Sequence, residues 1–504
     1  MSGNGLAVEE QGPVSEVSDA IHGARRALPN AIWNGLRALA TAIVGFCTTP
    51  ILLRTLSHGD YAGWVLVSSV TSYLTITDIG LSTEVVRATA TARSEGDDRN
   101  GFDTVKAVTI IQGWFTLSML LLLVGVTVVF PHLFTDIPQA SIRRAQWALV
   151  VLGLTSLVQM GLNPLVAHQI GMERLDIGAK CMIVSRVGVF GWIVATASRG
   201  LAVVASGVAV LYTVAFVISA AWVYRIKPGF SLRTPFFGAS PYKPVIAFAR
   251  RRLVWFLGYF AAITFDVTIV GRYAYRDLVP FGLATSLAIV ASMAYDAVMA
   301  TLLPQIPGPT GEALPRFFRS FFAFALASAA LVVLGLALTS VIAVPLWVGH
   351  VQAPMVLHLL FPMLAVTFVR LVLDGATVFL IVRNEQRLCT WNHVLEAAVK
   401  LPIGVVLVQR YGAIGLIWAG LAGALLGMVL AVYRAIQTSQ VSHRIRFGFV
   451  PLVYSGVLLG VLMFARSAHR PLQFVVILVV GTGVAVRLLA SGALGQLGIV
   501  RTSH

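Results

Sequence analysis

Ionisable side chains within long apolar stretches are the residues of this sequence that could do chemistry. Charge in hydrocarbon is costly, so such residues usually face a water-filled cavity or a partner. Packing alone does not need as many as this sequence has, and we therefore predict a water-filled internal cavity. The residues are Arg37, Asp78, Glu84, Arg87 and Arg186 in the first half of the chain, and Asp266, Asp296, Arg370, Asp374, Glu396 and Lys400 in the second half.

Two arginines of the first half are candidates for binding an anionic group. Arg37 lies about two turns into the first apolar stretch with no acid within four residues, and Arg186 lies near the middle of the fifth. A planar guanidinium can hold a phosphate through two parallel hydrogen bonds. We expect both to line the cavity, and a structural ion pair with Asp78 or another acid stays open as the alternative. Arg87 lies at an inner helix end, where it can bind phosphate or extend to the membrane surface.

Asp266 is the candidate for reversible ion binding. It lies in an apolar stretch in which Arg272 is the nearest cation along the chain. A carboxyl in such a place can be neutral when desolvated and ionised when water enters, so it could carry a proton or a sodium ion. Asp374 and Asp78 are the next candidates for this role.

Two further pairs have the spacing of one helical turn. Arg370 and Asp374 are four residues apart, and each would lie on the same face of a helix. Glu396 and Lys400 have the same spacing. Each pair could neutralise itself and be purely structural, or it could face the cavity. We include Arg370, together with Asp78, among the candidate substrate-binding residues.

The composition sets the class of protein. Of the 504 residues, 57% are hydrophobic and only 12% are charged, whereas an ordinary soluble domain carries about 25% charged residues. The mean hydropathy is +0.84. There are too few polar side chains to cover a soluble chain of this length, so a soluble protein is excluded. The net charge of +16 does not indicate nucleic-acid binding, because the cations sit in short gaps between apolar stretches and are better explained as topology signals.

The apolar stretches predict an all-α polytopic membrane protein. A helix needs about 20 apolar residues to cross the hydrocarbon core, and on that basis we predict about 14 transmembrane helices. Most Lys and Arg residues then fall in segments on the inner side, which places both termini in the cytoplasm. The predicted spans are 30–54, 61–88, 104–130, 145–170, 176–198, 200–224, 250–274, 279–303, 317–348, 355–382, 391–410, 412–436, 447–465 and 471–490.

The order of these spans divides the chain into two six-helix bundles around a central cavity, followed by two C-terminal helices. Residues 49–66 and 266–283 form a faint internal repeat, each with the end of one helix, a short loop with an aspartate and the start of the next helix. Related halves with substrate handled between them are a known transporter plan. The predicted parts are a cytosolic N-terminal tail (1–29), the N-terminal bundle (30–224), a basic cytoplasmic linker (225–249), the C-terminal bundle (250–436), an additional helix pair (447–490) and a cytosolic tail (491–504).

The sequence lacks the common motifs of enzymes and metal sites. It has no Gly-Lys dipeptide and hence no Walker motif, and neither HExxH nor GxSxG occurs. Its cysteines, Cys47, Cys181 and Cys389, are far apart and have no metal-ligand spacing. All predicted outer loops are short, which leaves no outer domain for an active site. We predict that the protein is not an enzyme and that it uses no metal or cofactor.

The second predicted span and its end resemble the Wzx-type polysaccharide flippases. In that family the second helix typically has Tyr-x-x-Trp, then Asp-x-Gly-Leu, then a stretch of small residues with an arginine. The first and seventh spans are also similar to that family, so that the resemblance covers residues 30–440. The matching residues are Asn34, Pro50, Leu53 and Arg54 in the first span, Tyr61, Trp64, Asp78, Gly80, Leu81 and Arg87 in the second, and Asp266 and Gly271 in the seventh.

This resemblance implies a member of the multidrug/oligosaccharidyl-lipid/polysaccharide exporter superfamily, with two six-helix bundles around a V-shaped cavity and alternating access. The implied substrate is an undecaprenyl-pyrophosphate-linked oligosaccharide, moved from the inner to the outer leaflet of the bacterial plasma (inner) membrane for surface polysaccharide or exopolysaccharide synthesis. A diphosphate head cannot cross hydrocarbon unaided, and Arg37 and Arg186 fit a cationic path for it. The implied partners are membrane lipids and the polysaccharide polymerase and export proteins.

Two other functions stay open. A drug/cation antiporter of the same superfamily would share the fold and Asp266, and it would need a cavity more acidic than basic. A membrane glycosyltransferase or O-antigen polymerase is the enzyme alternative, against which the short outer loops argue. The family core has twelve helices, so the pair at 447–490 departs from it and matches the fourteen-helix peptidoglycan-precursor flippases in number.

Overall fold

The computed structural model shows an all-α protein. It describes residues 13–76, 81–95, 98–226, 258–300 without 259 and 263, 311–439 without 312 and 384, and residues 457, 460 and 461. Within these residues there is no β-strand, and ten helices are long and apolar enough to cross a membrane. These match predicted spans one, three to six and eight to twelve, which confirms the all-α polytopic class. Apart from residues 457, 460 and 461, the predicted helix pair (447–490) lies outside the described residues, as do the C-terminal tail and most of the linker (225–249).

The first half contains helices α1 to α8. Long runs of Leu, Val and Ala form most of them, and a glycine makes one of the tight turns: Gly200, between α6 and α7, has φ +95°, a value that favours glycine. Helix α1 begins well before residue 30, where the first span was predicted to start. The helices are α1 (Pro13–Thr55), α2 (His58–Ile76), α3 (Leu81–Glu95), α4 (Asp98–Leu133), α5 (Gln139–Gly171), α6 (Leu175–Thr196), α7 (Leu201–Ala221) and α8 (Val223–Ile226).

The second half contains helices α10 to α15. Pro354 occupies the first turn of α13, where its missing N–H costs nothing. Gly412, with φ +68°, makes the turn between α14 and α15. The helices are α10 (Asp266–Tyr273), α11 (Leu278–Ala300), α12 (Ala313–Val348), α13 (Ala353–Val382), α14 (Gln386–Tyr411) and α15 (Ala413–Thr438).

Two predicted spans correspond to more than one helix among the described residues. Helices α2 and α3 cover the predicted span 61–88 except for residues 77–80, which include Asp78 and lie outside the described residues. The predicted span 250–274 is interrupted, because Thr264 and Phe265 form a turn and α10 begins at Asp266. The second prediction failed because a count of apolar residues cannot distinguish one helix from two helices joined by an apolar turn.

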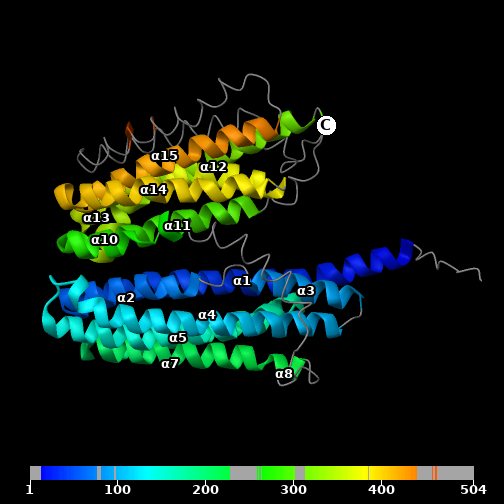
Figure 1. Ribbon diagram of the computed structural model, residues 1–504, viewed down its shortest axis with the longest axis horizontal. Helices are drawn as coiled ribbons and strands as arrows, with labels where there is room; N and C mark the ends of the chain where they lie inside the picture. Colours follow the sequence, from blue (N-terminus) through cyan, green and yellow to red (C-terminus); the bar gives the residue numbers. More distant parts are fainter. Residues whose placement is uncertain are drawn as a thin grey trace, which may run out of the picture.

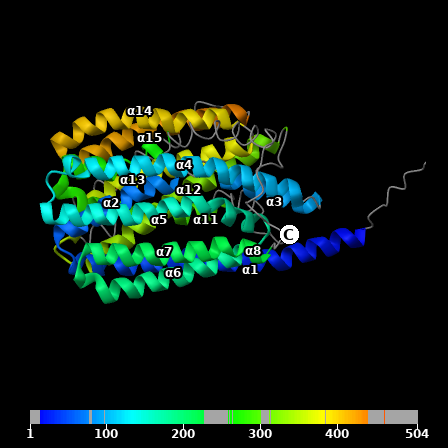
Figure 2. The same cartoon turned by 60° about the horizontal axis from the view of Figure 1, so that its bottom comes forward.

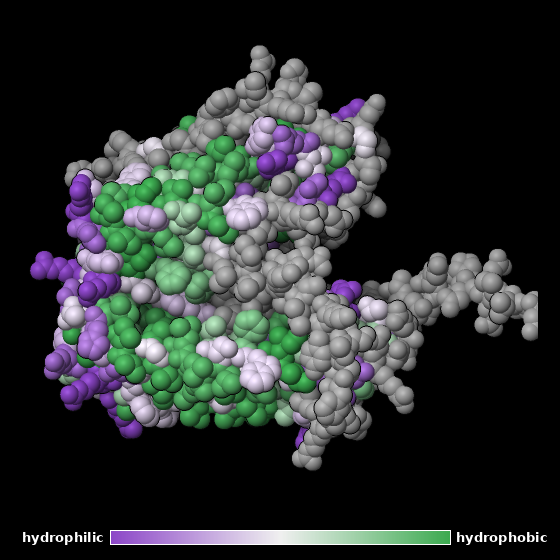
Figure 3. Space-filling model, viewed as in Figure 1, coloured by the Kyte–Doolittle hydropathy of each residue, from purple (hydrophilic) through white to green (hydrophobic). Residues whose placement is uncertain are grey.

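The two halves lie side by side, with most helices running along the long axis of the molecule. Helices α10 to α15 form the upper half in Figure 1 and α1 to α8 the lower half, and α1, α6 and α7 lie together in Figure 2. On the face shown in Figure 3, apolar side chains cover much of both halves, and hydrophilic residues gather at one end. On α4, for example, the side chains of Trp114, Leu121 and Val128 are exposed. Such an apolar surface is suited to contact with lipid.

The halves contact each other near the end that carries residues 56–57, 134–138, 274–277 and 349–352, which the sequence predicts to face outward and which we call the outer end. The ring of Tyr275 meets that of His58 edge-on, with centroids 6.2 Å apart. The Arg272 guanidinium donates to the carbonyl of Leu133 at 2.9 Å. His58 and Tyr275 belong to the two segments of the predicted repeat, so equivalent loops of the two halves meet here.

Close packing strengthens this contact. A Cβ added at Gly271 of α10 would lie 2.6 Å from Leu66 Cδ2 of α2, so the two helices approach closely only because the residue is small. The indole of Trp347 stacks on Phe46 with centroids 5.0 Å apart and donates to the Phe46 carbonyl at 2.7 Å. One cluster of buried apolar residues continues through both halves.

Candidate functional site

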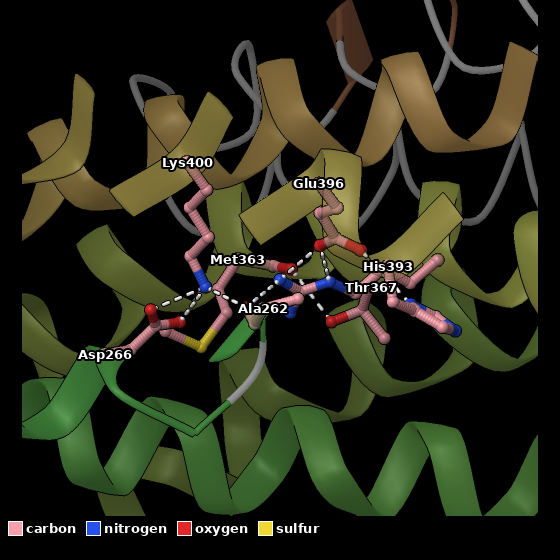
Figure 4. A network of polar contacts seen from close by, with 8 residues as sticks. Ala262, Asp266, Met363, Thr367, His393, Glu396 and Lys400 are labelled. Atoms are coloured by element: carbon pink, nitrogen blue, oxygen red, sulfur yellow. Dashed lines mark hydrogen bonds and ion pairs between the residues drawn. The ribbon is translucent and has the colours of Figure 1, made fainter. Parts of the chain in front are cut away.

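An ion pair between Asp266 and Lys400 lies inside the second half (Figure 4). Lys400 Nζ is 2.5 Å from Oδ1 and 2.6 Å from Oδ2 of Asp266. Asp266 is the first residue of α10, and Lys400 lies in the central part of α14 with its side chain 1% exposed. The partner of Asp266 is therefore a cation 134 residues away rather than Arg272, its neighbour in sequence.

The interruption of the seventh helix supplies a third oxygen atom. Residues 260–262 are helical and precede the turn at Thr264 and Phe265. Carbonyls at the end of a helix lack intrahelical donors. The carbonyl of Ala262 accepts a hydrogen bond from the Lys400 ammonium and another from Arg370 Nη2 at 3.0 Å. The end of this helix is thus held by two side-chain cations.

A second ion pair joins α13 to α14. Arg370 Nη2 lies 2.7 Å from Glu396 Oε1, and its Nε donates to the same oxygen at 2.9 Å. Glu396 is completely buried, and His393 Nδ1 lies 3.6 Å from its other oxygen. Of the two alternatives for Glu396 and Lys400, the pair that neutralises itself within one helix does not form, because each of these side chains pairs with a residue of a different helix.

The two ion pairs form one connected group, which we call the charge network: Asp266, Arg370, Glu396 and Lys400 with the carbonyl of Ala262. Its two cations and two carboxylates balance each other, and they come from α10, α13 and α14. Removing one member of a buried pair leaves an uncompensated charge, so the members depend strongly on one another. Chemically, the charge network can hold three helices together, and its carboxylates can exchange a proton.

The interrupted helix also contacts the first half. The hydroxyl of Tyr73 in α2 donates to the Thr264 carbonyl at 2.8 Å and lies 2.6 Å from the Thr268 hydroxyl. Its ring meets that of Phe260 edge-on, with centroids 5.0 Å apart. One short segment, residues 260–268, therefore carries both Asp266 and a contact between the halves. A rearrangement of the ion pair between Asp266 and Lys400 can therefore move the residues that contact Tyr73 of the first half.

Asp374 lies next to the charge network. It follows Arg370 by one turn of α13 and interacts electrostatically with His393 and with Arg370. The structure thus brings three of the predicted site residues into one region of the second half: Asp266, Arg370 and Asp374.

Arg186 occupies a different environment in the first half. It lies in α6 and donates a hydrogen bond to the hydroxyl of Tyr212 in α7, and its guanidinium carbon is 4.9 Å from the centre of that ring. Within the described part of the chain Arg186 forms no ion pair, and its Nε is buried without a hydrogen bond. Its hydrogen-bond partner is the neutral phenol of Tyr212, and no carboxylate of the described residues compensates its charge.

The remaining predicted site residues are dispersed. Arg37 is exposed on α1, the helix that packs beside α6. Arg87 of α3 pairs with Glu84 at 2.6 Å and is largely exposed. Asp78 lies outside the described residues.

Sequence analysis did not identify His393, the carbonyl of Ala262 or Tyr73 as participants. His393 precedes Glu396 by three residues, and Lys400 follows by four, so the spacing of a polar helix face was present in the sequence. Nothing in the sequence marks the carbonyl of Ala262, because the interruption of the helix makes it available. Tyr73 gave no signal either, since its partners are 191 and 195 residues away. Among the described residues, no group of three or more His, Cys, Asp or Glu is placed to hold a metal ion.

The fold is similar to that of solved membrane transporters. No family model and no curated protein matches this sequence. Solved structures do match: lipid II flippase MurJ in an inward closed conformation, with a TM-score of 0.67 and 11% identity over 92% of this chain and 100% of that chain. An inward-facing multidrug resistance MATE family transporter of the MOP superfamily gives a TM-score of 0.63 and 13% identity over 81% and 96%. A MOP superfamily transporter from Pyrococcus furiosus Vc1 matches with a TM-score of 0.54 and 12% identity, over 87% of this chain and 96% of that chain.

At these identities the similarity establishes the fold. The chain has the fold of MOP superfamily transporters and is a multi-pass membrane protein. This agrees with the superfamily that the sequence resemblance implied, without distinguishing its Wzx-type branch from the others.

Proposed function

We propose that the protein moves a lipid-linked oligosaccharide with a diphosphate head from the inner to the outer leaflet of the bacterial plasma membrane by alternating access. The observation that carries this proposal is the uncompensated guanidinium of Arg186. It lies within a candidate membrane span, has a neutral phenol as its hydrogen-bond partner and keeps a buried Nε without an acceptor. A cation in such a place needs an anionic partner, and phosphate oxygens match the geometry of a guanidinium.

The fold comparison supports a lipid-linked substrate. The lipid II flippase structure matches over 92% of this chain, whereas the inward-facing MATE transporter matches over 81%. Arg37 is the second residue that we assign to the diphosphate, because α1 packs beside α6. Arg87, Asp78 and Arg370 are further candidate contacts, and Arg370 would have to exchange Glu396 for the substrate.

We assign ion coupling to Asp266 and Asp374. Both carboxylate oxygens of Asp266 already contact Lys400, so a coupling ion has to compete with that ammonium. A proton needs one oxygen lone pair, whereas a metal cation needs a coordination shell of several oxygen atoms. A proton is therefore the coupling ion that fits this pair. In this proposal the termini face the cytoplasm, and a polymerase and export proteins receive the product.

Transport in proteoliposomes tests the proposal. Vesicles that contain the wild type should move an undecaprenyl-pyrophosphate-linked oligosaccharide between leaflets faster than protein-free vesicles. Arg186→Ala should slow this movement about tenfold or more, the effect of losing a hydrogen bond to a charged group. Arg143→Ala, which removes an exposed arginine of α5, is the matched control and should leave the rate unchanged. Efflux of an organic cation without movement of the lipid would favour a drug/cation antiporter instead.

A further inference from the structure

The ammonium of Lys400 is surrounded by oxygen atoms in the manner of a bound cation. Both carboxylate oxygens of Asp266 lie within 2.6 Å of Nζ, and the Ala262 carbonyl accepts a hydrogen bond from the same nitrogen. One of these oxygens belongs to the end of an interrupted membrane helix. Carbonyls at such interruptions are the groups with which membrane transporters coordinate monovalent cations.

The charges around the Lys400 ammonium show which group would have to replace it if the lysine were removed. Of the groups that face Lys400, α10 contributes Asp266, α13 contributes Arg370, and α14 itself contributes Glu396. Helix α15 contributes Gly420, whose added Cβ would lie 3.5 Å from Lys400 Cε. Because Arg370 already pairs with Glu396, removing the Lys400 ammonium would leave Asp266, whose side chain is 17% exposed, as a largely buried carboxylate without its ion-pair partner.

We propose that the Lys400 ammonium is a tethered counter-ion that fills a monovalent-cation site formed by Asp266 and the Ala262 carbonyl. The wild-type protein therefore takes up no sodium at Asp266. A variant without this side chain opens the site to sodium or to a small free amine, because both the negative charge and the space of the lysine chain remain. This inference concerns the second half alone and does not depend on which substrate the protein transports.

The tether has a consequence for the conformational cycle. An inorganic ion can leave its site and change the balance between two states, but only through different affinities for those states. The Lys400 ammonium cannot leave, because its side chain is covalently attached to α14. In the wild type, the ion pair of Asp266 is therefore broken by proton exchange or by separation of the two side chains, and not by the departure of an ion.

Thermal unfolding of the purified protein in N-methylglucamine chloride, compared with sodium chloride or methylammonium chloride at equal ionic strength, tests the inference. Lys400→Ala should show a saturable rise in Tm of a few degrees with either sodium or methylammonium, because a ligand that binds the folded state stabilises it. The wild type should show none. The double variant Lys400→Ala with Asp266→Asn should lose the response. Lys180→Ala, which removes a half-exposed lysine paired with Asp176, is the control and should behave like the wild type.

Two outcomes would overturn the proposal. One is a folded Lys400→Ala protein that responds to neither sodium nor methylammonium. The other is a sodium response of the wild type that Asp266→Asn abolishes, a measurement that does not depend on the folding of any lysine variant. If Lys400→Ala folds only when sodium or methylammonium is present, that requirement itself supports the proposal. Because no oligosaccharide is present in these measurements, neither result decides the transport proposal.

Discussion

The two halves of the molecule treat charge inside the membrane in different ways. In the second half, the charge network joins two cations and two carboxylates from three helices. In the first half, the pair of Asp60 and Arg144, at 2.9 Å, lies near the outer end, while Arg186 contacts the neutral side chain of Tyr212. The charge network therefore compensates its own charges, whereas Arg186 has no carboxylate partner among the described residues.

From this difference we infer that the two halves have different roles, one in substrate binding and one in the response to a coupling ion. Buried charges that compensate one another fix the positions of the helices that carry them. A cation without a carboxylate partner is free to bind and release an anion. We therefore assign the substrate head group to the first half and the response to a coupling ion to the second. The segment that carries Thr264, Asp266 and Thr268 is the structural link between them, through Tyr73.

The largest expected effect comes from breaking the charge network. Glu396→Gln should destabilise the protein by about 3–5 kcal/mol, because it leaves the largely buried Arg370 without the carboxylate with which it pairs. The additional change Arg370→Gln should recover much of this loss, which thermal unfolding of the purified protein measures. Glu173→Gln is the matched control: its ion pair with Arg93 is exposed, and exposed pairs contribute about 0–1 kcal/mol. Equal losses for Glu396→Gln and Glu173→Gln would contradict the structural role of the network.

A smaller effect is expected from separating the halves at the outer end. Gly271→Leu places a side chain where Leu66 already lies, so the contact between α10 and α2 has to open. Cross-linking between His58→Cys and Tyr275→Cys, in a background without the three native cysteines, should fall in this variant. Gly191→Leu is the control, because an added Cβ there meets nothing within 4 Å. Unchanged cross-linking in Gly271→Leu would show that this glycine does not hold the halves together.

The smallest expected effect is the loss of one hydroxyl between the halves. Tyr73→Phe keeps the aromatic packing but removes the hydrogen bonds to Thr264 and Thr268, which corresponds to about 1 kcal/mol. The same cross-linking measurement should show a modest decrease, smaller than that of Gly271→Leu. Tyr433→Phe, an exposed tyrosine of α15, should have no effect. A larger loss in Tyr73→Phe than in Gly271→Leu would reverse the ranking of these contacts.

Helix length was predictable from the sequence, because it has a simple physical cause. The predicted span 317–348 is α12, Ala313–Val348, and the predicted span 412–436 is α15, Ala413–Thr438. A membrane needs an apolar run of fixed length, and that requirement is visible residue by residue. The sequence also identified the ionisable residues that form the charge network.

The partners of those residues were not predictable. Lys400 meets Asp266 across 134 residues, and such a contact depends on the packing of α10 against α14 rather than on any local spacing. The interruption at Thr264 and Phe265 lies in an apolar stretch without proline or glycine between Ala261 and Val270. No turn residue marks it, so the sequence predicted a continuous helix there.

The comparison between the halves is tested most directly by the affinity of the purified protein for an undecaprenyl-pyrophosphate-linked oligosaccharide. Arg186→Gln removes the uncompensated cation of the first half, and Asp266→Asn neutralises the coupling carboxylate of the second half. The account predicts that Arg186→Gln weakens binding about tenfold or more, whereas Asp266→Asn leaves it unchanged in protein that remains folded. Full affinity in Arg186→Gln, or loss of affinity in Asp266→Asn alone, would contradict the assignment of the substrate to the first half.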